Sequence, residues 1–209
     1  MTGNATPTPH SADITGLILA GGNARRMGGV AKGLLPMQGR SMIAHAIARL
    51  GPQVGEIMIS ANSADYDRLG LSVVHDLVAD PISGRAGPLA GLHAGLLACA
   101  TPWLVTVPCD APFLPPDLVG RLASARSASR QSRLFVAESP RGLEPGFLLC
   151  HVSLADDLGR WLAAGGRKAQ AWLAEQSALA VEFPDAHAFA NINTPEELAA
   201  CHGNDAPAA

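Results

Sequence analysis

The sequence predicts an α/β fold of three layers, in which helices cover both faces of a doubly wound, mostly parallel sheet. Two observations predict this fold. Short apolar runs typical of buried strands alternate along the chain with segments whose apolar residues recur every three or four positions, as in helices. Hydrophobic residues make up 48% of the 209 residues and aromatic residues only 4%, which favours an aliphatic core packed between helices and strands.

The chain length fits one domain, because no linker rich in proline, glycine and serine divides its middle. We expect that domain over residues 13–202, with disordered tails at 1–12 and 203–209. The first twelve residues lack the charged and apolar regions of a signal peptide. No apolar run approaches the roughly 18 residues that a membrane span needs.

Charge and cysteine content exclude several functional classes. The net charge of -3 argues against a broad nucleic-acid surface, so a polyanionic ligand would need a local cluster of cations. The four cysteines show no paired spacing typical of a zinc site or a disulfide framework. We therefore expect a protein of the reducing cytoplasm that binds neither nucleic acid nor membranes. We also expect it to be a monomer, although neither charge nor cysteine content decides this.

The first predicted strand, residues 14–19, leads into a glycine-rich loop that ends at Lys32. Glycines in this loop allow a positive φ and a close approach of backbone N–H groups to a ligand, and its cations can contact phosphate oxygens. Its spacing matches neither the dinucleotide fingerprint nor the phosphate loop that ends in Gly-Lys-Ser/Thr. The alternative is a flexible connection whose cations face water. The residues concerned are Gly21, Gly22, Arg25, Arg26, Gly28, Gly29 and Lys32.

The next segments predict a helix from Ser41 to Leu50, a strand at 57–59, a short helix from Ser63 and a strand at 71–74. Alternation of this kind implies parallel pairing, and ligands of such sheets bind beyond the carboxyl ends of the strands. The polar residues at these two strand ends are Ser60, Asn62, His75 and Asp76.

A connection over residues 75–87, long enough to act as a flap, precedes a helix with Pro88 in its first turn. Gly87 and Gly91 would permit close approach of a ligand, or equally close packing of the helix on the sheet. The strand at 103–107 ends in Cys109 and Asp110. Asp110 can hold Mg²⁺ against nucleotide phosphates, or cap the following turn, whereas Cys109 is expected to pack.

The second half predicts a helix opened by Asp117 and two short strands around the turn at 139–142, followed by packing helices after Ser153. Near the end, Thr194, Pro195 and Glu197 form the pattern of a capping box at a strand-to-helix corner. Asn191 and Asn193 alternate before this corner and are expected to share one face of the strand. Their amides could bind a heterocycle or satisfy the backbone of the corner.

Six segments together resemble the molybdenum cofactor guanylyltransferases over most of residues 14–200. They are Leu-Ala-Gly-Gly at 19–22, Arg-Met-Gly-Gly at 26–29, Lys-Gly-Leu-Leu at 32–35, Gly-Pro-Leu-Ala-Gly at 87–91, Pro-Cys-Asp at 108–110 and Asn-Ile-Asn-Thr-Pro-Glu-Glu-Leu at 191–198. The resemblance implies that Asp110 binds Mg²⁺ and the nucleotide, that Lys32 contacts the phosphates, and that Asn191 and Asn193 face the pterin acceptor. The further residues expected at the nucleotide are Leu19, Ala20, Gly21, Gly22, Ser60, Asn62, Asp76 and Gly87.

The reaction implied by this resemblance joins GMP, from Mg-GTP, to the terminal phosphate of molybdopterin and releases pyrophosphate. The attacking phosphate is already an anion, so the reaction needs charge neutralisation, with Lys32 and Arg26 over the phosphates, rather than a general base. Molybdenum-insertion proteins and molybdoenzyme chaperones are the implied partners. The alternatives are a cytidylyltransferase for the same pterin, a sugar-phosphate nucleotidyltransferase, and a non-catalytic carrier of the cofactor.

The chain departs from the family pattern at three positions. Ala31 stands where an aspartate usually precedes the lysine, and Ser60 stands where an asparagine is frequent. Glu144 precedes Pro145 where the family tends to have His-Pro. These differences bear on the orientation of Lys32, on nucleotide binding and on recognition of the acceptor.

Overall fold

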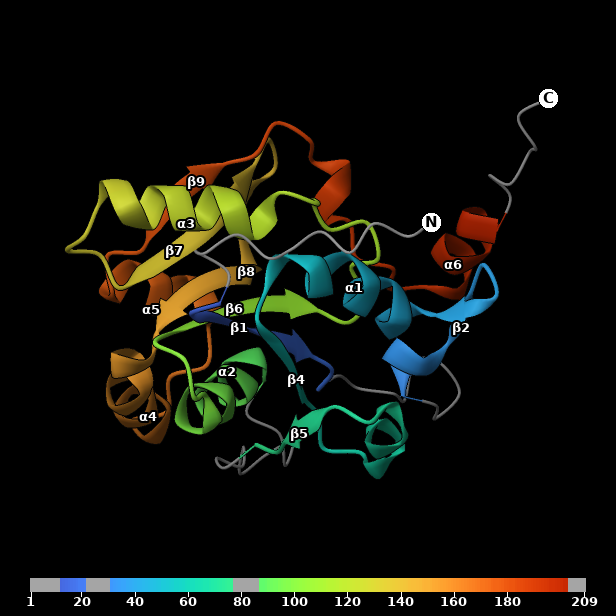
Figure 1. Ribbon diagram of the computed structural model, residues 1–209, viewed down its shortest axis with the longest axis horizontal. Coiled ribbons are helices and arrows are strands. Elements are labelled where there is room, and N and C mark those ends of the chain that lie inside the picture. The colour runs from blue at the N-terminus through green and yellow to red at the C-terminus, as the bar shows by residue number, and fades with distance from the viewer. Residues whose placement is uncertain (1–11, 22–30, 77–86, 203–209) are drawn as a thin grey trace.

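The computed structural model describes residues 12–21, 31–76 and 87–202. Within these residues a seven-stranded sheet has the order β5-β4-β1-β6-β8-β7-β9. Helices lie on both of its faces (Figure 1). The strands of this sheet are β1 (Ile14–Leu19), β4 (Glu56–Ser60), β5 (Ser72–Val74), β6 (Trp103–Pro108), β7 (Leu134–Ser139), β8 (Gly142–His151) and β9 (Leu179–Glu182).

Five of the six α-helices in the described residues pack against the two faces of the sheet, and the sixth, α6 (Pro195–His202), lies apart from it. The other five are α1 (Met42–Leu50), α2 (Pro88–Ala98), α3 (Leu118–Ala128), α4 (Ala155–Ala163) and α5 (Ala169–Glu175). A separate hairpin of β2 (Pro36–Met37) and β3 (Arg40–Ser41) precedes α1. None of the helices in the described ranges is long and apolar enough to cross a membrane.

One reversed strand, β8, marks the boundary between two halves of the sheet, the first made of β5, β4, β1 and β6 and the second of β8, β7 and β9. The strands β5, β4, β1 and β6 pair in parallel, whereas β8 runs antiparallel to both β6 and β7. The last strand, β9, pairs in parallel with β7. The prediction of a doubly wound, mostly parallel α/β sheet is therefore confirmed. The chain adds β4 and β5 on one side of β1 and then β6 on the other, so the topological switch point lies between β1 and β6.

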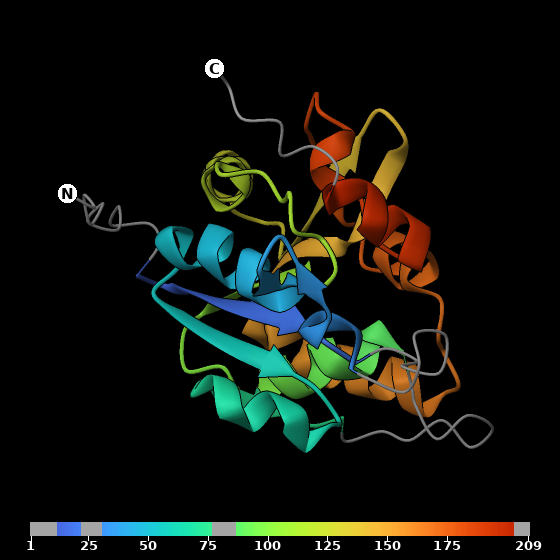
Figure 2. The same ribbon diagram turned by 90° about the vertical axis from the view of Figure 1, so that its right-hand side faces the viewer.

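Alternation along β1 explains why both faces of the sheet are covered. Ile14 and Ile18 are fully buried in one apolar core, which also contains residues of α1 and α3. Leu17 points the other way, into a second core with residues of α2, α4 and α5. Because successive strand residues face opposite sides, a strand covered on both faces is buried at almost every step, and in β1 this includes the polar Thr15, whose hydroxyl is hydrogen-bonded to that of Thr101 at 2.8 Å. Figures 1 and 2 show α1 and α2 on opposite sides of β1.

The helix α2 lies unusually close to the strands beneath it. A Cβ on Gly91 would collide with the Ser60 hydroxyl, and one on Gly95 would collide with the side chain of Leu17. Of the two interpretations of Gly91, close packing on the sheet is therefore what the structure contains. Pro88 occupies the first turn, as expected, and Gly87 before it has a φ of 77°, which favours glycine.

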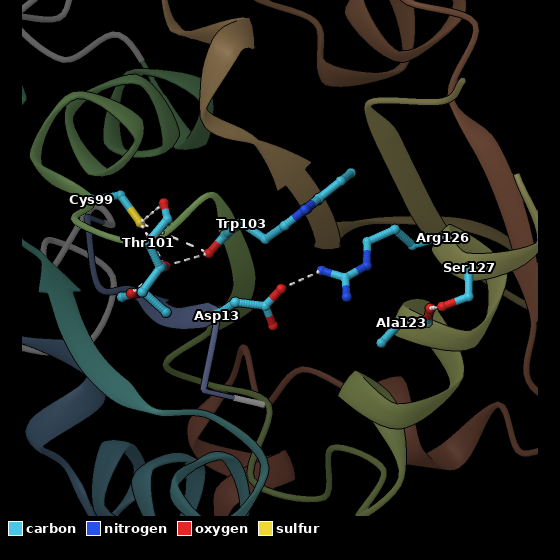
Figure 3. A network of polar contacts seen from close by, with 8 residues as sticks. Asp13, Cys99, Thr101, Trp103, Ala123, Arg126 and Ser127 are labelled. Atoms are coloured by element: carbon cyan, nitrogen blue, oxygen red, sulfur yellow. Dashed lines mark hydrogen bonds and ion pairs between the residues drawn. The ribbon is translucent and has the colours of Figure 1, made fainter. Parts of the chain in front are cut away.

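The edge of the sheet where β1 and β6 begin is joined by polar and ring contacts (Figure 3). Arg126 of α3 donates a hydrogen bond of 3.1 Å to Asp13, and its guanidinium lies 5.2 Å from the ring centroid of Trp103. Thr101 donates to the carbonyl of Trp103 at 2.9 Å, and Cys99 donates to the carbonyl of Thr101 at 3.3 Å. These contacts therefore join α3 to the starts of β1 and β6, at the end of the sheet opposite the carboxyl ends of the parallel strands.

The short helix expected from Ser63 is present as a 3₁₀ helix over Ala64–Leu69, with Ser63 as its N-cap. One other expectation about local structure fails. Residues 190–193 form no strand, so the expectation that Asn191 and Asn193 alternate on a strand is wrong. Their backbone is held instead by a tertiary bond, because the amide of Ile192 donates to the carbonyl of Asp110 at 2.9 Å.

The C-terminal helix α6 packs beside the β2–β3 hairpin, near the other end of the chain (Figure 1). Ile192, Met37 and Met42 form a small buried cluster there, with Leu198 packed against it. The last described segment is thereby brought to the residues that follow the glycine-rich loop.

Candidate active site

A pocket of about 590 Å³ opens where β1 and β6 end. This is the topological switch point, where open α/β sheets bind ligands. Leu19, Ala20 and Gly21 line it from the end of β1, and Pro108, Cys109 and Asp110 from the end of β6. The remaining lining residues are Lys32, Pro88, Pro145, Gly146, Ala169, Asn191 and Asn193.

Three polar side chains from distant parts of the sequence meet in this pocket. The ammonium of Lys32 forms an ion pair with the carboxylate of Asp110. The same ammonium donates a hydrogen bond of 2.7 Å to the amide oxygen of Asn193. The side chains of Lys32 and Asp110 are only 18% and 15% exposed, so their attraction is screened less than that of a surface pair.

Hydrogen bonds beyond the last ladder residues hold the two strand ends in register. The amide of Cys109 donates to the carbonyl of Leu19 at 3.1 Å, and the amide of Ala20 donates to the carbonyl of Ser60 at 2.8 Å. The loops that carry Ala20 and Asp110 are therefore fixed to the central strands before they diverge.

Lys32 begins a 3₁₀ turn over Lys32–Leu34, and the next residue, Gly33, is tightly enclosed. A Cβ at Gly33 would lie 2.9 Å from the hydroxyl of Tyr66 and 3.1 Å from the sulfur of Cys109. Burial raises the pKa of the Cys109 thiol to about 12, so the thiol is neutral at ordinary pH. Cys109 therefore packs beneath the site, as the sequence predicts, rather than acting as a nucleophile.

The polar residues at the ends of β4 and β5 form a second group outside the lining of this pocket. Asn62 donates a hydrogen bond of 2.8 Å from its amide to the Asp76 carboxylate, and the Asp76 amide donates back to the Asn62 side chain at 3.1 Å. The expected neighbours at these strand ends thus do meet. Their contact with a nucleotide is a prediction that still needs a test.

Two other expected nucleotide contacts do not face the pocket. Ser60 is 1% exposed and its hydroxyl lies under Gly91, so this side chain is enclosed between the sheet and α2. The reason is the close approach of α2, which the sequence did not reveal. Gly87 is exposed and precedes the pocket residue Pro88. Gly22 and Arg26, and the part of the glycine-rich loop over 22–30 that contains them, lie outside the described residues, as does most of the 75–87 connection that was expected to act as a flap.

One wall of the pocket was missed by sequence reasoning. It is formed by Pro145 and Gly146, in the middle of β8. The pairing of β7 with β8 shifts register between Val136 and Ala137, and residues 145–147 lie at this irregularity. A proline and a glycine within a strand pattern are the signal that could have indicated a bulge.

A buried hydroxyl holds this bulge against β6. Thr106, which is fully buried, donates a hydrogen bond of 2.9 Å to the carbonyl of Gly146 and accepts one of 3.1 Å from the amide of Leu148. The side chain thus replaces the ladder contacts where the backbones of β6 and β8 separate. A Cβ on Gly146 would lie 2.6 Å from the ring of Pro108, so a larger residue at this position would have to displace the wall.

The departure at Glu144 does not bring a carboxylate into the lining of the pocket. Glu144 accepts a hydrogen bond of 2.7 Å from Ser139 and lies 3.6 Å from the guanidinium of Arg141. Arg141 also donates to the carbonyl of Ala186 at 2.8 Å. Glu144 therefore braces the β7–β8 turn from within, and its partner Arg141 joins that turn to Ala186.

A metal ion at this site would have few protein ligands in the described part of the chain. Nowhere in that part do three or more His, Cys, Asp or Glu side chains stand close enough together to hold one ion. Among the described residues that line the pocket, Asp110 is the one that carries a carboxylate. Magnesium bound with a nucleotide commonly takes one or two carboxylates and completes its shell with phosphate oxygens and water. The residues present therefore fit a Mg²⁺ ion that arrives with its nucleotide.

Comparison with known proteins identifies the family. A family model described as "MobA-like NTP transferase domain" matches residues 16–180. A molybdenum cofactor guanylyltransferase of Cupriavidus taiwanensis is 51% identical over 194 residues, which cover 90% of this chain and 96% of the relative. The chain belongs to this family. A second member of it, from Ralstonia nicotianae, is 49% identical over 90% of this chain and 95% of its own length.

Solved structures share the fold at low sequence identity. A molybdopterin-guanine dinucleotide biosynthesis protein A from Archaeoglobus fulgidus is 21% identical, with a TM-score of 0.68 over 90% of this chain and 97% of its own. A CMP:2-keto-3-deoxy-manno-octonic acid synthetase complexed with CTP is 13% identical, with a TM-score of 0.69 over 92% of this chain and 97% of its own. The architecture is thus common to nucleotidyltransferases with different names, and likeness of fold alone does not choose among their substrates.

Proposed function

We propose that this chain transfers GMP from GTP to the terminal phosphate of molybdopterin and releases pyrophosphate. Membership of the molybdenum cofactor guanylyltransferase family supports the substrates. The observation that carries the proposal is the meeting of Lys32, Asp110 and Asn193 in the switch-point pocket. These three groups provide a cation for phosphate, a carboxylate for Mg²⁺ and an amide on the side toward the acceptor.

The chemistry requires one bond to form and one to break. An oxygen of the acceptor phosphate attacks the α-phosphorus of GTP, and the bond between the α-phosphorus and the bridging oxygen of pyrophosphate breaks. Because both reactants are anions, the task of the site is to neutralise charge and to hold the groups in line. This accounts for a pocket with charged groups but without a nucleophilic cysteine.

The roles of the individual residues follow from their places around the pocket. Lys32, with Arg26, would contact the phosphates, and Asp110 would hold Mg²⁺, which when bound supplies positive charge to the phosphate oxygens. The backbone of Leu19, Ala20 and Gly21 would approach the nucleotide. The further nucleotide contacts proposed are Gly22, Asn62, Asp76 and Gly87. Ser60, which was expected among them, is enclosed under Gly91, and its carbonyl accepts the amide of Ala20, so it would support the end of β1 rather than contact the nucleotide.

Asn191 and Asn193 line the pocket on the side of the C-terminal segment, and we assign them to the pterin acceptor. Pro145 and Gly146 extend the same side with an apolar surface, which suits a flat heterocycle. We further propose that the protein acts as a monomer in the cytoplasm, where molybdenum-insertion proteins and molybdoenzyme chaperones would supply its acceptor and take its product.

The decisive experiment mixes the purified protein with molybdopterin or the molybdenum cofactor, Mg²⁺ and either GTP or CTP. Mass spectrometry then identifies any nucleotide joined to the pterin. A GMP adduct that forms with GTP alone, with pyrophosphate released only when Mg²⁺ is present, is the expected result. A CMP adduct would support the same transfer reaction but show that the enzyme uses CTP. Tight pterin binding without any adduct would indicate that the protein is a non-catalytic carrier of the cofactor.

A further inference from the structure

The ammonium of Lys32 has two acceptors of different kinds. One is the charged carboxylate of Asp110, and the other is the neutral amide oxygen of Asn193 at 2.7 Å. If Asp110 binds a cation during the reaction, its ion pair with Lys32 weakens. The hydrogen bond from Lys32 to Asn193 then still orients the ammonium. A long, rotamer-rich lysine side chain needs such a second partner to stay in one place.

Asn193 itself lies outside any helix or strand, so its position depends on the residues that follow it. The carboxylate of Glu197 accepts hydrogen bonds from the amides of Asn193 and Thr194, at 2.5 and 3.1 Å. In return, the hydroxyl of Thr194 accepts the amide of Glu197 at 3.1 Å. The capping box expected from the sequence is therefore present, and it reaches one residue further back than a helix cap alone requires.

The preceding residue ties the same segment to the carboxylate side of the site. Ile192 is buried against Met37 and Met42, and its amide donates to the carbonyl of Asp110 at 2.9 Å. Asn193 is thus fixed on one side by Ile192 and on the other by Glu197, and its side chain spans the gap to Lys32. The first turn of α6 and the start of the 3₁₀ turn at Lys32 are coupled through one amide group.

We propose that Glu197 is a positioning residue, which orients Lys32 through Asn193 without touching substrate. In this chain the arrangement supplies an orienting group for Lys32 although the preceding residue is Ala31, which has no carboxylate to offer. The consequence for catalysis rests on the proposed function, whereas the orientation of Lys32 can be measured without any substrate.

The orientation of Lys32 can be followed by lysine labelling, because the sequence contains only two lysines, Lys32 and Lys168. Lys168 is exposed and serves as the internal reference. Brief acylation with an N-hydroxysuccinimide acetate, followed by peptide mass spectrometry, gives the ratio of the two labelling rates. With Glu197→Ala we expect Lys32 to be labelled about fivefold faster relative to Lys168, which corresponds to losing one hydrogen bond.

Three matched variants separate positioning from a general loosening of α6. Glu196→Ala removes the same charge from the same turn, and Thr194→Ala removes the other half of the capping box while the Glu197 carboxylate still holds Asn193. Both should leave the ratio near that of the wild type. Glu197→Gln retains a side-chain oxygen and should restore the wild-type ratio. An unchanged ratio in Glu197→Ala, or an equal rise in Thr194→Ala or Glu196→Ala, would overturn the proposal.

A kinetic arm links the orientation to the reaction. With GTP, Mg²⁺ and molybdopterin, Glu197→Ala should lower kcat about fivefold, and Glu197→Gln should recover the rate. Fivefold loss of kcat that Glu197→Gln does not recover would count against positioning. If the wild type forms no nucleotide adduct at all, the proposed function fails, and the labelling ratio still decides the role of Glu197.

Discussion

The two halves of the sheet build their shares of the pocket by different means. In the parallel half, β1 and β6 end at the pocket, and Ala20 and Asp110 lie directly beyond these ends. In the other half, the wall comes from Pro145 and Gly146, in the middle of the reversed strand β8. The first construction needs only that a strand should stop. The second needs a bulge whose position depends on pairing with β7 and on a hydroxyl from β6.

The charged groups of the site and the wall that shapes the pocket therefore belong to different halves of the sheet. Charged groups of the described site lie at the ends of parallel strands or on the 3₁₀ turn at Lys32, where their mutual distances follow from the topology. The wall in the other half offers apolar surface and backbone, so it governs the width of the pocket. Substitutions in the parallel half should therefore lower turnover, whereas substitutions in the other half should lower stability.

The largest effect is expected from the charged groups of the parallel half. Lys32→Ala and Asp110→Ala should each lower the rate of GMP transfer at least about a hundredfold, as loss of a charge-stabilising group commonly does. The rate of formation of the nucleotide-joined pterin measures this effect. Lys168→Ala, which removes the other lysine of the chain, should leave the rate unchanged. Near-normal turnover in either variant would show that the substituted residue does not stabilise charge in the reaction.

The next effect concerns the stability of the bulge in the other half. Thr106→Val keeps the side-chain shape but removes the hydroxyl that bonds Gly146 and Leu148. The carbonyl and amide left without it are buried, so the free energy of unfolding should fall by about 2 to 3 kcal/mol. Urea denaturation measures the change. A variant as stable as the wild type would mean that the hydroxyl does not hold β8 to β6.

A smaller loss is expected from filling the space between the two halves. In Gly146→Ala the new methyl group would lie 2.6 Å from the ring of Pro108, so the wall must shift, at a cost of about 1 to 2 kcal/mol. Gly120→Ala is the matched control. It lies exposed on α3 with no atom within 4 Å of the added carbon, and it should stabilise the protein by about 0.5 to 1 kcal/mol. Equal effects of the two substitutions in urea denaturation would contradict the crowding at Gly146.

The smallest effect should come from a residue of the reversed strand that faces away from the pocket. Glu144→Ala removes the partner of Ser139 and Arg141 and should lower the free energy of unfolding by about 1 kcal/mol. The KM for molybdopterin should not change, since Glu144 does not line the pocket. A rise in this KM beyond about threefold, about 0.7 kcal/mol, would show that the carboxylate reaches the acceptor side after all.

The same division explains what sequence reasoning could and could not reach. It found β1, α2 and the capping box of α6, because apolar runs, a first-turn proline and a Thr-to-Glu spacing are local signals. It also placed Asp110 and Lys32 correctly at one pocket, because carboxyl ends of parallel strands share an edge.

Long-range packing produced the failures. Nothing near Ser60 in the sequence indicates that Gly91 would bring α2 down onto its hydroxyl. The reversed β8 and its bulge depend on register with β6 and β7, which local patterns do not encode. Residues 190–193 alternate like a strand but form a loop, because the buried Ile192 bonds to Asp110 rather than to a neighbouring strand.

The close seating of α2 has a consequence for anyone who would transplant this site into another scaffold. A designer would copy the polar residues first, yet the height of Pro88 above β1 is set by Gly91 and Gly95, which make no contact with the pocket. With alanine at those two positions the helix would be lifted off the strands, and the pocket would open on that side even if every polar residue were present. The graft therefore has to include two positions defined by the absence of a side chain.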